Sequence, residues 1–137
     1  MAITLYDSEQ SEISYISLVL DGTYGDVRTE QFFVKNSSEL HYLTDFIISL
    51  PNSDYSAGYM RDGYSVKIIV ADTLPSQADW DLVGPGQSAS MDDIGSLGNP
   101  DTSSYRSFFV RVSCPGNQPV SLVDQVSVRF SYIERLA

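Results

Sequence analysis

The sequence contains few of the residues on which most enzymes, zinc proteins and nucleic-acid-binding proteins depend. Its 137 residues include one cysteine, one histidine and one tryptophan. A single cysteine, Cys114, excludes an intrachain disulfide framework and any zinc site built from cysteines. Lys and Arg number 8 against 18 Asp and Glu, which gives a formal net charge of −10. So acidic a chain repels phosphate backbones, and nucleic acid is therefore not an expected partner.

Long hydrophobic runs are also missing. The uninterrupted apolar stretches are only a few residues long, whereas a membrane-spanning helix needs about 20 apolar residues. The opening stretch MAITLYDSEQSE carries three acidic residues and has neither a basic nor an apolar region. It therefore does not resemble a signal peptide. We expect no membrane association and synthesis in a reducing cytoplasm, where the sequon Asn36-Ser37-Ser38 is accidental.

What the chain does contain is apolar residues at every second position, the period of a strand with one buried face. This alternation occurs in segments 46–50, 64–70, 108–112 and 126–132, and further strands are expected at 3–6, 13–20, 30–35 and 94–97. The six prolines all fall between these candidates, as expected for residues without an amide donor. The pattern predicts an all-β chain.

About seven short strands at this spacing predict a single antiparallel β-sandwich of immunoglobulin-like type, with a small barrel as the alternative. One short helical turn is expected near 75–81. There Pro75 suits a first helical position, Ser76 and Asp79 have the spacing of a capping box, and Trp80 would hold the turn to the core. We assign residues 13–137 to the sandwich. The polar residues 1–12 form either an N-terminal arm or a frayed terminus.

Signals for catalysis are scarce. His41 lies between Leu40 and Tyr42, where a histidine is more often structural or exposed than catalytic. The chain has no nucleophile elbow, no phosphate-binding GxxxxGK and no dinucleotide-binding GxGxxG. A Ser–His–Asp arrangement remains open, because its members meet only in the fold. We expect no enzyme activity, and no catalytic or cofactor-binding residues are assigned.

Acidic residues cluster at 21–26 and 79–93, but neither stretch has the D-x-D-x-D-G order of a calcium loop. Turns and helix caps account for most of these aspartates, so no metal ligand is assigned. Paired carboxylates for glycoside hydrolysis depend on their separation in space, which the sequence does not give. Cys114 precedes Pro115 and is more simply a packed free thiol than a nucleophile.

The most informative segment is 51–63, PNSDYSAGYMRDG, a long connection without strand pattern. Loops of this length inside a compact domain are commonly functional. Tyrosine mixed with small polar residues suits a protein interface, and we predict contact residues Tyr55, Tyr59, Met60 and Arg61. The alternatives are that these tyrosines pack beneath the loop, or that Tyr55, Tyr59, Tyr64 or Trp80 stack on a sugar.

Several stretches, in this order, resemble the immunoglobulin-like β-sandwich of tailed-bacteriophage structural proteins. They are QFFVKNSS (31–38), SVKIIVA (65–71), WDLVGPG (80–86), DIGSL (93–97), FFVRVSCPGN (108–117) and VSVRFSYIE (126–134). The resemblance implies a non-enzymatic virion protein, either of the accessory or decoration type or associated with the tail or baseplate. Its partners would be other virion proteins of the capsid, neck, tail or baseplate, and copies of itself. A carbohydrate-binding sandwich that recognises a host glycan is the alternative.

Overall fold

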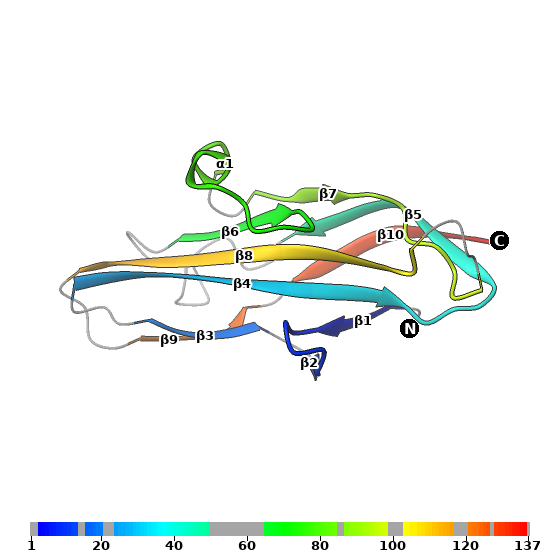
Figure 1. Cartoon of the computed structure of the whole chain (residues 1–137), viewed down its shortest axis with the longest axis horizontal. Coiled ribbons are helices and arrows are strands. Elements are labelled where there is room, and N and C mark those ends of the chain that lie inside the picture. Colours follow the sequence, from blue (N-terminus) through cyan, green and yellow to red (C-terminus); the bar gives the residue numbers. More distant parts are fainter. Residues whose placement is uncertain are drawn as a thin grey trace.

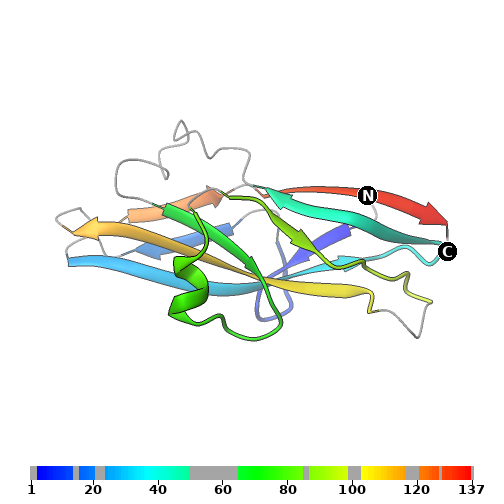
Figure 2. The same ribbon diagram turned by 90° about the horizontal axis from the view of Figure 1, so that it is seen from above.

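A computed structural model describes residues 3–13, 16–20, 24–49, 65–84, 87–98, 103–116, 121–126 and 128–136, with backbone alone for 16–20, 24–26, 114–116 and 121–126. Most of this part of the chain is strand, with one short helix, and two antiparallel sheets pack face to face (Figures 1 and 2). The prediction of an all-β sandwich is therefore confirmed.

The elements are β1 (Ile3–Tyr6), β2 (Glu12–Ile13), β3 (Ile16–Leu20), β4 (Tyr24–Asn36), β5 (His41–Ser49), β6 (Ser65–Val70), α1 (Gln77–Asp81), β7 (Ala89–Met91), β8 (Tyr105–Gly116), β9 (Ser121–Val126) and β10 (Arg129–Leu136). One sheet has the order β2-β1-β4-β8-β6 and the other β10-β5-β7, while β3 and β9 form a two-stranded ribbon. Neither larger sheet closes on itself within the described strands, so the arrangement is a sandwich rather than the alternative barrel.

The spine of the molecule is the ladder between β4 and β8, which runs from the pair Tyr24–Gly116 to the pair Lys35–Tyr105. Figure 1 shows these two strands side by side along most of the length of an elongated domain. The predicted alternation is confirmed here, because Phe108, Val110 and Val112 are all buried. These long paired strands give the sandwich a continuous hydrogen-bonded layer.

Aromatic rings connect the two sheets. Phe108 of the spine lies 6.2 Å from Phe130 of β10, and Phe130 lies 5.6 Å from Phe46 of β5, measured between ring centroids. Phe108 also stacks on Phe32 of β4 at 5.8 Å. Aromatic pairs at these separations each contribute about 0.5–1.5 kcal/mol beyond the area they bury. The core is therefore a connected set of rings flanked by aliphatic residues.

Residues 3–6, within the segment expected to form an arm, are instead a strand of the sheet. β1 pairs with β4 from Ile3–Asn36 to Tyr6–Phe33, and it also pairs with β2. Ile3 and Leu5 are buried in the core. The apolar residues at positions 3 and 5 thus outweigh the polar composition of the segment as a whole.

The predicted helical turn is confirmed as α1. Ser76 is the N-cap, and its side chain and that of Asp79 form the reciprocal hydrogen bonds of a capping box. Pro75 therefore precedes the helix instead of occupying its first position. Trp80 is fully buried, with the Arg111 guanidinium 4.7 Å from its ring centroid and Lys67 donating to its backbone carbonyl oxygen. Two cations of the spine sheet thus hold the helix in place.

Asn36, the asparagine of the sequon, is a structural residue. Its side chain is buried, and its amide donates to the backbone oxygens of His41 and Gly95 at 2.8 and 3.1 Å. Its side-chain oxygen accepts from the Ser38 amide at 2.9 Å. Both of its N–H groups and its oxygen are therefore engaged, and the nitrogen is closed to glycosylation in the folded protein.

Candidate functional site

The predicted contact residues Tyr55, Tyr59, Met60 and Arg61 lie outside the residues that the structure describes, as does Tyr64. Of the proposed sugar-stacking rings, the structure describes only Trp80, whose ring is fully buried next to Arg111. Trp80 therefore cannot present a face to a sugar. Cys114 lies on β8, where its backbone pairs with Asp26.

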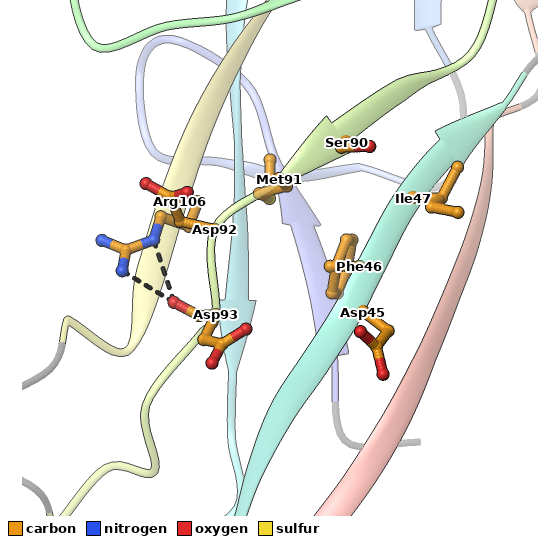
Figure 3. Close-up of a pocket in the computed structure, with 8 residues that line it drawn as sticks. All are labelled: Asp45, Phe46, Ile47, Ser90, Met91, Asp92, Asp93 and Arg106. Carbon is orange, nitrogen blue, oxygen red and sulfur yellow. Dashed lines mark hydrogen bonds between the residues drawn. The ribbon is translucent and has the colours of Figure 1, made fainter.

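A hollow with a volume of about 660 Å³ lies between β5, β7 and one end of β8 (Figure 3). It is lined by Asp45, Phe46, Ile47, Ser90, Met91, Asp92, Asp93 and Arg106. Phe46 and Met91 are buried and form its floor. Three aspartates and one arginine make up its rim.

Interrupted strand pairing creates this hollow. β7 pairs with β5 over only three residues, up to Met91–Phe46, and pairing resumes at the single bridge Ile94–Leu43. Asp92 and Asp93 occupy the interruption, consistent with the low strand preference of aspartate. The predicted strand at 94–97 is accordingly reduced to this one bridge. The carboxylates thus lie where the sheet edge opens.

A bulge in β5 shapes the opposite wall. The register between β5 and β10 shifts between Ser131 and Ile133, so that Tyr132 faces both Asp45 and Phe46. Asp45 adopts φ of 53°, in the left-handed region, and its carboxylate lies 4.0 Å from the Arg135 guanidinium. Bulges of this kind bend a strand and redirect its side chains. Here the bulge leaves the Asp45 side chain exposed at the rim of the hollow.

Arg106 joins the two sheets at this rim. It extends from β8, and its Nε and Nη2 donate to the backbone oxygen of Asp93 at 3.1 and 2.7 Å (Figure 3). Two hydrogen bonds from one guanidinium converge on this single oxygen and hold the loop against β8. The arginine therefore has a structural role, and the rim as a whole presents carboxylates to solvent.

The groups that line the hollow can bind polar ligands. Carboxylate oxygens and the Ser90 hydroxyl can accept hydrogen bonds from cations, amines or hydroxyl groups. No group of three or more His, Cys, Asp or Glu side chains among the described residues is placed to hold a metal ion. None of the residues lining the hollow is a histidine that could activate Ser90 as a nucleophile.

His41 belongs to the turn between β4 and β5. Its backbone N–H donates to the Ser38 hydroxyl at 3.0 Å, and its Nδ1 lies 3.4 Å from the same oxygen. Its carbonyl oxygen accepts from Asn36. These contacts favour the structural role of His41 over the catalytic one.

The hollow was not predicted from the sequence, although the sequence contains one signal for it. Leu43, Phe46 and Ile48 are all buried, and the spacing of three between the first two breaks the alternation of a regular strand. Such a break indicates an extra residue in the strand. The role of Arg106 had no comparable signal, because its partner is a backbone oxygen of another segment.

No known protein family, curated protein or solved structure matches the chain. None of the helical residues in the described ranges belongs to a helix long and apolar enough to cross a bilayer.

Proposed function

We propose that this chain is a non-enzymatic building block that assembles through protein–protein contacts, and that its setting is the virion of a tailed bacteriophage. In this role it is an accessory, decoration, tail or baseplate protein that contacts other virion proteins and copies of itself. The sandwich supplies a rigid support, and side chains at its surface make the contacts.

The observation that carries the proposal is a cluster of three exposed leucines at one end of the sandwich. Leu40 lies in the turn before β5, Leu136 pairs with the adjacent His41, and the Leu97 amide donates to the Ser38 oxygen at 2.9 Å. All three side chains are more than half exposed. We call them the leucine tip. Single exposed leucines are ordinary, but apolar side chains gathered from three separate segments favour a contact surface.

Two further features support assembly. The strong negative charge keeps free copies soluble and apart before they meet a matching surface. Six stretches between residues 31 and 134 resemble, in the same order along the chain, the sandwich domains of phage structural proteins. This resemblance supports the virion as the setting. A closed assembly can use one such contact surface many times.

The test is attachment of the purified chain to particles made without it. The variant Leu40→Ser/Leu97→Ser/Leu136→Ser should attach poorly, whereas Leu74→Ser/Leu82→Ser should attach as the unaltered chain does. Leu74 and Leu82 are as exposed as the leucine tip but flank α1, so they control for the loss of surface leucine alone. Equal attachment of the two variants would contradict a contact at the tip, and failure of the unaltered chain to attach would contradict the virion role.

A further inference from the structure

A second surface lies where two strands change partners. β2 and β3 follow each other along the chain, as do β9 and β10, and β3 pairs with β9. Beyond this ribbon the strands part, because β2 pairs with β1 in one sheet and β10 pairs with β5 in the other. The segment 13–20, which was expected to be one strand, thus contributes to two strands, β2 and β3, which pair with β1 and β9 respectively.

An apolar groove opens at this fork. It has a volume of about 300 Å³ and is lined by Ile3, Thr4, Leu5, Glu12, Ile13, Val128 and Phe130. Ile13, Val128 and Phe130 are only partly buried. The groove therefore exposes apolar surface of both sheets, enough to receive one or two aliphatic side chains.

Two strand edges border the groove. β2 and β10 are the terminal strands of their sheets in the described part of the chain. β10 has eight residues, against two in β2, so among the described strands it offers the longer edge for pairing. An extended segment can add to such an edge through main-chain hydrogen bonds while its alternate side chains enter the groove.

Carboxylates gather on the β1–β2 hairpin, and one of them, Glu12, lines the groove. Asp7, Glu9 and Glu12 lie on this hairpin, and Glu30 of β4 is close enough that burial, together with the charges of Asp7 and Glu9, raises its pKa. We call these four residues the acidic collar. The neighbouring strand β4 carries two cations, Arg28 and Lys35, and Lys35 lies over the Tyr6 ring. Arg129 is exposed between Val128 and Phe130, which both line the groove.

We propose that this groove binds an extended segment of another protein, with apolar residues in the groove and flanking Lys or Arg residues at the acidic collar. The proposal rests on the proposed function only in requiring that the chain bind protein. A second copy is a poor occupant, because each copy carries a net charge of −10 and would bring its own carboxylates toward the collar. A basic partner gains attraction at the same place.

The probe is the synthetic peptide KKVTVIVKK, with binding to the full chain followed by fluorescence anisotropy. Two matched peptides separate the contributions: EEVTVIVEE reverses the flanking charge, and KKSTSGSKK removes the apolar residues. KKVTVIVKK should bind at least about tenfold more tightly than either control, and added salt should weaken it. Equal binding of KKSTSGSKK would overturn the proposal, since charge alone would then explain the affinity. No binding of KKVTVIVKK would also overturn it.

The location is tested by charge reversal. Glu9→Lys/Glu12→Lys should weaken peptide binding about tenfold, whereas Glu39→Lys/Asp92→Lys, an equal charge change at exposed positions away from both the collar and β10, should weaken it less than about threefold. Equal losses in the two variants would contradict the groove. A concentration-dependent dimer that the peptide dissociates would identify a second copy as the occupant and overturn the proposal.

Particle attachment separates this proposal from the virion role. The groove proposal alone fails if the unaltered chain attaches to particles but does not bind KKVTVIVKK, or binds it equally well after charge reversal at the collar. If the peptide binds at the groove but purified particles do not contain the chain, the virion role alone fails.

Discussion

Phe46 and Tyr132 stack with their ring centroids 5.4 Å apart and their planes 10° from parallel. Tyr132 also faces Asp45, because the bulge in β5 places two residues opposite one. The bulge allows Leu43 and Phe46 both to enter the core, and it requires the left-handed backbone of Asp45. The same distortion therefore serves the packing of the core and the shape of the acidic hollow.

Substitutions at Asp45 test this relationship. Asp45→Gly should match or exceed the stability of the unaltered chain, whereas Asp45→Val should lose about 1–2 kcal/mol, because a β-branched residue is strained at positive φ. Asparagine also adopts the left-handed conformation readily. Asp45→Asn therefore removes only the exposed ion pair with Arg135 and should change stability by less than about 0.5 kcal/mol. Urea denaturation measures all three. An undiminished stability of Asp45→Val would contradict the strained bulge.

Removing the amide of Asn36 should be costly. Asn36→Ala leaves the buried oxygens of His41 and Gly95 without their side-chain donor, and each buried unsatisfied group costs about 1–3 kcal/mol. The exposed neighbour Glu39 provides the control, since Glu39→Ala removes no hydrogen bond of this network. Thermal denaturation followed by circular dichroism compares the two. If both variants melt alike, the Asn36 network does not stabilise the turn as described.

Arg111 should control the environment of the only tryptophan. Arg111→Met removes the cation from the Trp80 ring and the hydrogen bonds to Thr29 and Gln77. The contact with the ring is worth about 0.5–2 kcal/mol, and its loss should loosen α1, so that tryptophan emission shifts to the red and acrylamide quenching rises. Arg135→Met is the control at an arginine far from α1 in the fold. An unchanged spectrum in Arg111→Met would show that the arginine does not hold the helix.

Glu30 should make stability fall as pH rises. Its pKa is raised by burial and by the charges of Asp7 and Glu9, so the folded state binds more protons than the unfolded state in the range just above the ordinary value of 4.5. Stability then decreases with rising pH through that range. Glu30→Gln should be more stable than the unaltered chain at pH 7 and equally stable below the ordinary pKa, where both side chains are neutral. A difference that does not depend on pH would contradict this explanation.

The features that could be predicted from the sequence are those that depend on the spacing of residues within one segment. Alternation at 108–112 and 66–70 correctly indicated buried faces, and the spacing of Ser76 and Asp79 correctly predicted the capped turn. Features that depend on contacts between distant segments were not predictable. Examples are the Arg106 hydrogen bonds to Asp93 and the change of partner after β2. The N-terminal arm was predicted from composition, whereas the apolar contacts of Ile3 and Leu5 determine where the segment lies.

The most direct test of the assembly role is quantitative mass spectrometry of particles purified from the host in which the chain is produced. If the chain is a virion protein, we expect a fixed number of copies relative to the major capsid protein, and this number should not change during repeated gradient purification. Its value would distinguish decoration, with copies near the number of capsid subunits, from a place in the tail or baseplate, with far fewer copies. Particles that lack the chain, or carry it in amounts that fall with each purification step, would contradict the proposed function.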